Sequence, residues 1–257
     1  MILTAITRAT IMKHKSLRSV LLMFMLLWSV SISANTYIVA VGIADYSLYP
    51  IKIRSLRLPA ADAGAFIDMY KSNTAFDYII LTDKDATRKR ILSAMNGVYR
   101  LAGPDDQVVF FFSGHGYAGG ICAADGNLSY KQVREAMKKS RSRNKMMFLD
   151  ACRSGGVRVE ASNGSAAVKS AKDASVMVFL SSRNNENSIE RPSMSNGYFT
   201  TYLVKGMKGA ADTDNNRIVT AYELFNYVHN MVEEVSGGKQ HPVMWGKFNS
   251  AMPVIRW

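Results

Sequence analysis

The chain has 257 residues, of which 48% are hydrophobic and 20% are charged, and its formal net charge is +12. This length allows one large domain or two small ones, and the composition is that of an ordinary globular protein with a sizeable core. There is no internal repeat or low-complexity stretch, and two cysteines are too few for a disulfide framework.

Residues 1–34 are predicted to be a secretory signal peptide. They contain four basic residues and no acidic one, followed by the apolar run Val20–Val30 and by the small residues of a cleavage region, Ser31–Ala34. The run of about 11 residues is short for a membrane span, which needs roughly 20. Met12 would be a more typical start than Met1. The sequence therefore predicts an exported protein, periplasmic or secreted, whose mature domain covers residues 35–257. No membrane contact is expected after the leader is removed. Two alternatives for residues 1–34 stay open: a buried helix and an uncleaved membrane anchor.

Apolar segments alternate with segments of helical periodicity along the rest of the chain. The pattern predicts strands over 36–44, 77–82, 107–112, 145–149 and 175–180, and helices over 59–70, 86–101, 130–140, 198–208 and 220–235. Such alternation is typical of an α/β fold with a mainly parallel sheet covered by helices on both faces. In such sheets, ligands bind beyond the carboxyl ends of the strands.

Two chemically capable side chains follow neighbouring predicted strands. His115 lies in Ser113-Gly-His-Gly116, and Cys152 lies in Asp150-Ala-Cys-Arg-Ser-Gly155. An imidazole can activate a thiol or protonate its leaving group, and the N–H groups of Gly116 and Cys152 could form an oxyanion hole. Taken singly, such a His is usually a loop residue and such a Cys is usually packing. Their shared placement favours a catalytic pair with a free thiol.

Two sequence blocks, Phe111-Phe-Ser-Gly-His-Gly116 and Phe148-Leu-Asp-Ala-Cys-Arg-Ser-Gly155, resemble the signature blocks of the caspase/metacaspase family. Further similarity extends over roughly 36–235. The resemblance implies a caspase-like α/β/α fold with a six-stranded sheet. It also implies that Cys152 is the nucleophile of a cysteine endopeptidase and that His115 is its acid/base.

The resemblance also bears on the substrate. Caspases bind Asp before the scissile bond through arginines, whereas metacaspases bind Arg or Lys through acids. Asp62, Ser113 and Asp150 match the metacaspase pocket, and a carboxylate facing a guanidinium forms charge-assisted hydrogen bonds. We therefore expect peptide or protein substrates cleaved after Arg, with Lys possible. Three alternatives stay open: Asp62 as a helix-terminus acid, Asp150 as a structural acceptor, and an acid-binding pocket made by Arg54 and Arg57.

The stretch 153–174 is rich in Gly, Ser, Ala and Lys and lacks an apolar period, which predicts a mobile loop. Family members carry a processing loop after the cysteine. A peptidase with basic specificity could cut its own loop at Arg158, Lys169 or Lys172.

No metal or other cofactor is expected, and calcium stays open as a less favoured alternative. Residues 212–223 resemble an EF-hand loop, with Asp212, Asp214, Asn216 and Glu223 at positions 1, 3, 5 and 12. However, Arg217 stands where the loop needs Gly for its sharp turn. The segment is instead expected to make a turn before a helix capped by Thr220. Many metacaspases bind calcium through acids after the His motif, where residues 117–127 offer only Asp125.

The remaining basic residues, histidines and cysteine are interpreted as surface or packing residues without a functional role. The basic residues between 138 and 145 have no aromatic neighbours, so a solvated surface is favoured over nucleic-acid binding. His229 and His241 are interpreted as surface residues and Cys122 as a packed strand residue.

Three alternative functions stay open, and the oligomeric state is left undetermined. They are an inactive caspase-like protein that binds peptides or partners, a related Cys–His peptidase of the clostripain or gingipain type, and a nucleic-acid-binding module.

Overall fold

A computed structural model describes residues 34–71, 75–117, 119–151, 176–182, 195–246 and 248–257. The chain divides into two units, Met1–Ser33 and Ala34–Trp257, and only the second is described here. The predicted signal peptide therefore lies outside the described residues, apart from Ala34. No helix of the described part is long and apolar enough to cross a bilayer.

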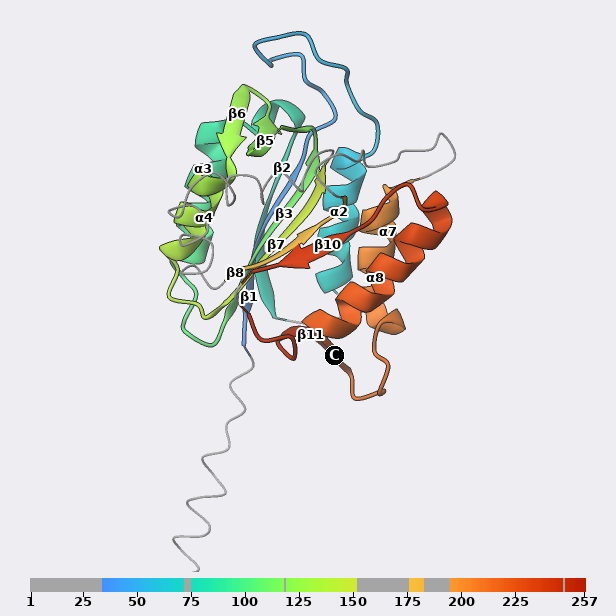
Figure 1. The fold of residues 1–257 in the computed structure, drawn as a ribbon. Coiled ribbons are helices and arrows are strands. Elements are labelled where there is room, and N and C mark those ends of the chain that lie inside the picture. Colours follow the sequence, from blue (N-terminus) through green and yellow to red (C-terminus); the bar gives the residue numbers. More distant parts are fainter. Residues whose placement is uncertain (1–33, 72–74, 118, 152–175, 183–194, 247) are drawn as a thin grey trace, which may run out of the picture. The chain divides into compact units, whose positions relative to one another are not determined.

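The second unit is built on a six-stranded sheet with the order β10-β8-β7-β3-β1-β2 (Figure 1). Five strands run parallel, and β10 pairs antiparallel with β8 at one edge. The strands are β1 (Thr36–Gly42), β2 (Phe76–Thr82), β3 (Gln107–Gly114), β7 (Asn144–Ala151), β8 (Val176–Leu180) and β10 (Val243–Trp245). The five parallel strands confirm the predicted runs, because each is an apolar stretch bounded by polar or glycine residues.

Helices cover both faces of this sheet (Figure 1). One face carries α2 (Pro59–Tyr70), α7 (Tyr198–Lys205) and α8 (Ala221–Ser236), and the other carries α3 (Arg88–Tyr99) and α4 (Tyr130–Lys138). Each face of the sheet contributes alternate side chains to a separate core, so that Val39 and Val41 face α3 while Ile38 and Ala40 face α2. The expected α/β/α architecture is confirmed.

Local sequence signals account for where the helices begin. Pro59 occupies the first turn of α2, where its missing N–H costs nothing. Ser129 and Thr220 cap α4 and α8 through capping boxes with Gln132 and Glu223. Thr220 was expected in this role.

The end of β1 and the start of α2 are unusually close. An added Cβ on Gly42 would lie 2.1 Å from the Pro59 carbonyl oxygen, so only glycine allows this approach. The contact brings the first turn of α2 to the carboxyl-terminal edge of the sheet, where the candidate site lies.

Several short elements were not predicted. A second sheet contains β4 (Gly116–Tyr117), β5 (Gly120–Ala123) and β6 (Gly126–Ser129), and a third pairs β9 (Ile218–Thr220) with β11 (Pro253–Arg256). Strands of two to four residues are too short to show a period of two. The predicted helix over 86–101 is shorter in the structure because the short helix η1 (Asp83–Asp85) and the cap Thr87 precede it.

Candidate active site

Two buried carboxylates meet at the carboxyl-terminal edge of the sheet. Asp150 is the penultimate residue of β7, and its register partner on β3 is Ser113, which in turn lies beside Gly42 of β1. Asp62 comes from the first turn of α2. Asp62, Ser113 and Asp150 are 2%, 3% and 6% exposed, so water solvates neither carboxylate well. The three residues predicted to line a substrate pocket therefore lie together.

Asp62 accepts three hydrogen bonds from neutral donors. The Ser113 hydroxyl donates to Oδ2 at 2.8 Å, while the Asn196 amide group and the Gly197 backbone N–H donate to Oδ1 at 2.9 and 3.1 Å. These bonds fix the orientation of the carboxylate without neutralising its charge.

Asp150 is held by Thr200 in the first turn of α7. The Thr200 hydroxyl and backbone N–H donate to Oδ2 at 2.8 and 3.3 Å. A Cβ added to Gly197 would lie 2.8 Å from that Oδ2 and 3.6 Å from Oδ2 of Asp62. The two carboxylates thus border the same glycine, whose lack of a side chain keeps the space beside them open.

Burial raises the pKa of Asp62 above its ordinary value, and the negative charge of Asp150 raises it further. The hydrogen bonds from Asn196, Ser113 and Gly197 lower this pKa in part. A cation placed beside the two carboxylates would relieve their repulsion and favour the ionised form of Asp62.

His115 directly follows β3 and is positioned by its neighbours on two sides. Its Nε2 lies 2.7 Å from the carbonyl oxygen of Arg54, and because a carbonyl can only accept, Nε2 carries the proton. Its backbone N–H donates to the Tyr46 hydroxyl at 2.7 Å, and the two rings lie 4.8 Å apart. In the neutral imidazole, Nδ1 is therefore the basic nitrogen.

Gly114 makes the approach of Tyr46 possible. Its φ of 154° and the 2.6 Å that would separate an added Cβ from the Tyr46 hydroxyl exclude a side chain at this position. Tyr46 in turn donates to the Cys122 carbonyl oxygen at 3.3 Å. Sequence reasoning did not identify Tyr46 as a site residue, although its run Val41-Gly-Ile-Ala-Asp-Tyr46 carries part of the family resemblance.

Cys152 lies outside the described residues. The last residue of β7 before it is Ala151, which is the register partner of Gly114. Ser181, after β8, holds this strand end: its hydroxyl accepts from the Ala151 N–H at 3.1 Å and lies 3.3 Å from the Ala151 carbonyl oxygen. His115 and Cys152 are thus the next residues in sequence after a directly paired Gly114 and Ala151.

Gly116 begins β4 and pairs with Ile121. The Cys122 N–H donates to the His115 carbonyl at 2.9 Å, which makes Gly116 and Ile121 a pair that does not exchange backbone hydrogen bonds. The N–H of Gly116 is therefore not used in bonding to Ile121.

The remaining predicted residues are distributed as follows. The side chains of Arg54 and Arg57 are exposed, and neither is among the donors to Asp62 described above. Arg158, Lys169 and Lys172 lie outside the described residues. Cys122 is buried on β5, as expected, and its thiol accepts from the Tyr49 hydroxyl at 3.4 Å.

The interpretation of His229 and His241 as surface residues without partners was wrong. His229 Nδ1 donates to the Pro242 carbonyl at 2.8 Å, and both imidazoles lie within 4 Å of the Glu233 carboxylate. The partners come from the next turn of α8 and from the segment after it, which sequence periodicity does not reveal.

The carboxylates of Asp212, Asp214 and Glu223 lie within 4.8 Å of one another. Glu223 accepts from Thr213 and Thr220, and Asp212 accepts from the N–H groups of residues 216 and 217. Arg217 adopts a φ of 64°, so the sharp turn that was expected to need Gly forms without it. Before this segment, α7 and the π-helical turn η3 (Gly206–Ala210) cover the helix that was predicted over 198–208.

Comparison with known proteins identifies the family. The model of the caspase domain family, Peptidase_C14, matches residues 36–251, and the chain therefore belongs to that family. Protein GSU0716 from Geobacter sulfurreducens has a similar fold: the TM-score is 0.60 at 17% sequence identity, over 84% of this chain and 94% of that one. No curated protein matches the sequence.

Proposed function

We propose that this chain is an exported cysteine endopeptidase that cleaves after arginine, and also after lysine, with Cys152 as nucleophile and His115 as acid/base. The observation that carries the specificity is the pair of buried carboxylates, Asp62 and Asp150, which meet beside Gly197. Membership of the caspase domain family supports the peptidase class.

The two carboxylates repel one another, and a cation bound between them would stabilise the ionised form of both. Each buried charge costs several kcal/mol in desolvation, and two like charges add repulsion. A guanidinium with five N–H donors can bridge two carboxylates in a planar fork, which makes arginine the best occupant. A lysine ammonium offers three donors from one point and fits less completely. An aspartate side chain would meet like charge and be rejected.

In the proposed reaction, the Cys152 thiolate attacks the carbonyl carbon of the residue before the scissile bond and forms a tetrahedral oxyanion. The N–H groups of Gly116 and Cys152 donate to that oxygen. Protonated His115 gives its proton to the leaving amine, and a thioester remains. His115 then takes a proton from water, whose oxygen attacks the thioester and releases the carboxylic acid and the thiol.

The structure supports this role for His115 through its tautomer. Because Nε2–H is used by the Arg54 carbonyl, Nδ1 is the nitrogen left to exchange a proton with thiol, amine or water. Gly114 and Ala151 are register partners of neighbouring parallel strands and immediately precede His115 and Cys152 in sequence, which supports the proposal that these two residues act as a pair.

The test is hydrolysis of matched fluorogenic peptides ending in Arg, Lys, Gln or Asp, by protein that lacks residues 1–34. We expect Arg to be best, Lys to be second, and Gln and Asp to be slower by at least about 100-fold, as loss of charge-assisted bonds implies. Cys152→Ala and His115→Ala should each abolish activity. Cleavage after Asp would reverse the specificity, and equal hydrolysis by the Cys152→Ala protein would rule out the nucleophile.

Autoprocessing is a separate part of the proposal. Arg158, Lys169 and Lys172 follow Cys152 within one polar stretch, which a peptidase with basic specificity could cleave. Active protein should give two fragments on a denaturing gel, and Cys152→Ala should stay whole. A variant with all three residues changed to Gln that is still cut in this stretch would contradict these positions.

A further inference from the structure

Positive charge is concentrated in two segments on one face of the sheet. Residues 88–99, which form α3, and residues 130–145, which contain α4, hold ten lysines and arginines against one glutamate, whereas the whole chain has a net charge of +12. Residues 1–34 contribute four further cations and no acid. The two segments, which lie on the face of the sheet covered by α3 and α4 (Figure 1), therefore carry nine net positive charges before their ion pairs with acids from other segments are counted.

Some of these cations are already neutralised. Arg88, Arg90, Lys138 and Arg143 form ion pairs with acids, and Arg134 and Lys145 are buried. The exposed cations that have no acidic side chain within 4 Å among the described residues are Lys89, Lys131, Lys139 and Arg141.

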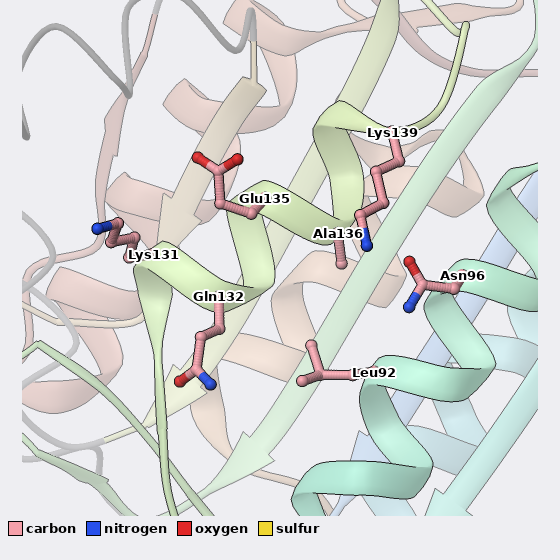
Figure 2. A pocket seen from close by; sticks show the side chains of 7 residues that line it. All are labelled: Leu92, Asn96, Lys131, Gln132, Glu135, Ala136 and Lys139. Carbon is pink, nitrogen blue, oxygen red and sulfur yellow. The ribbon is translucent and has the colours of Figure 1, made fainter.

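Two of the four line a hollow between α3 and α4 (Figure 2). It has a volume of about 330 Å³ and is lined by Leu92, Asn96, Lys131, Gln132, Glu135, Ala136 and Lys139. Figure 2 shows the Lys139 ammonium and the Asn96 carboxamide turned toward the gap between the helices, with Leu92 below them. Figure 2 shows Lys131 and Glu135 on the same side of α4, turned away from Asn96, and the Glu135 carboxylate is neutralised by Lys138, whose ammonium lies 3.2 Å away. The open charge of the hollow is therefore positive.

We propose that this hollow, with its lining residues Leu92, Asn96, Lys131 and Lys139, binds an acidic peptide segment of a partner protein. Lys131 and Lys139 are eight residues apart, which corresponds to about 12 Å along a helix axis. An extended peptide covers that span in about four residues, so two acidic side chains at i and i+4 would meet both lysines. An apolar side chain between them would contact Leu92 and Ala136, and Asn96 offers amide hydrogen bonds to the peptide backbone.

The chemistry of the lining favours a peptide over the other polyanions. None of the seven lining residues is aromatic, so the hollow offers no surface on which a base could stack. A lipid bilayer presents a flat array of headgroups and has no segment that would enter a space between two helices. Binding in this hollow is independent of the proposed peptidase activity, because no residue assigned to catalysis or to the substrate pocket lines it.

The test uses the full chain carrying Cys152→Ala, so that no probe is cleaved. The probe is a fluorescein-labelled peptide with the core Glu-Ala-Leu-Ala-Glu, and binding is followed by fluorescence anisotropy at 50 and 200 mM salt, roughly the range over which surface charge is screened. The double variant Lys131→Glu, Lys139→Glu should weaken binding at least about tenfold. The matched control, Lys205→Glu with Lys208→Glu near the end of α7 on the opposite face, makes the same change in net charge and should alter the Kd less than about twofold.

Two further probes separate the proposal from general attraction to anions. The same peptide with Gln in place of Glu, and one with Ser in place of Leu, should both bind more weakly. Equal weakening by the α4 and α7 double variants would overturn the proposal in favour of a net-charge effect. Tighter binding of a DNA oligonucleotide or of anionic phospholipid vesicles, lost in the α4 variant, would assign the face to that ligand instead.

Discussion

The backbone N–H of His115 donates a 2.7 Å hydrogen bond to the hydroxyl of Tyr46, whose ring lies 4.8 Å from the imidazole. Tyr46 also donates to the Cys122 carbonyl, and the Cys122 N–H donates to the His115 carbonyl. The Tyr46 hydroxyl therefore links the backbone of His115 to the backbone of Cys122, and these two residues are also hydrogen-bonded to each other. Tyr46 acts on the proposed reaction as a positioning residue.

Tyr46→Phe should lower kcat about tenfold while leaving KM within about twofold, because it removes a buried hydrogen bond from the His115 backbone and touches no pocket residue. Steady-state kinetics on the Arg peptide across pH gives both constants and the pH profile. The control is Tyr49→Phe, since the Tyr49 hydroxyl contacts the Cys122 thiol and Asn127 but is not bonded to His115. A Tyr46→Phe enzyme with unchanged kcat and an unchanged pH profile would show that the bond is merely structural.

Asp62→Asn should raise KM for the Arg peptide at least about 100-fold and narrow the preference for Arg over Gln, because an amide keeps the shape and loses the charge that a guanidinium would pair with. Michaelis constants for the two peptides measure this. Asp68→Asn, on the exposed side of the same helix, is the matched control and should leave both constants within twofold. If Asp62→Asn cleaves the Arg peptide as well as the parent does, Asp62 is a structural acid.

The raised pKa of Asp62 has a consequence for stability. An acid whose folded-state pKa lies above its unfolded value of about 4 holds its proton more tightly when folded, so its contribution to stability is lost as pH rises toward the folded-state pKa. Urea unfolding should therefore show the parent losing about 1 kcal/mol or more relative to Asp62→Asn between pH 5 and pH 8. Parallel pH dependences for the two proteins would contradict the raised pKa.

The sequence predicted the parts of this site that depend on strand ends. Ser113 and Asp150 are register partners, and His115 directly follows the strand that pairs with β7, as the rule for parallel sheets requires. The sequence could not predict which residues donate hydrogen bonds to the Asp62 and Asp150 carboxylates. Asn196, Gly197 and Thr200 contact the carboxylates from positions 50 to 135 residues away, and such long-range bonds leave no periodic or local signal.

The same limit applies to turn conformation. Arg217 was expected to disfavour the sharp turn of an EF-hand loop, which needs Gly at this position, yet its φ is 64°. Its N–H donates to Asp212, and the Asn216 N–H donates to both Asp212 and Asp214. Several local hydrogen bonds together outweigh the roughly 1–2 kcal/mol that the left-handed conformation costs a residue with a side chain. The general preference of residues with side chains for negative φ therefore predicts the wrong backbone conformation at Arg217.

Gly197→Ala should weaken cleavage after Arg by filling the space between the carboxylates, since the added Cβ would lie 2.8 Å from the Asp150 Oδ2. The loss should appear mainly as a rise in KM of at least about tenfold, because the methyl group competes with the guanidinium rather than with the thiol. Gly64→Ala is the matched control: it lies in α2, two residues after Asp62, and its Cβ would meet nothing within 4 Å. That variant should keep its kinetics and gain up to about 1 kcal/mol of stability from the better helix former. Kinetics on the Arg peptide together with urea unfolding measure both effects. If Gly197→Ala keeps its KM while it stays folded, the basic side chain does not enter beside Asp62 and Asp150.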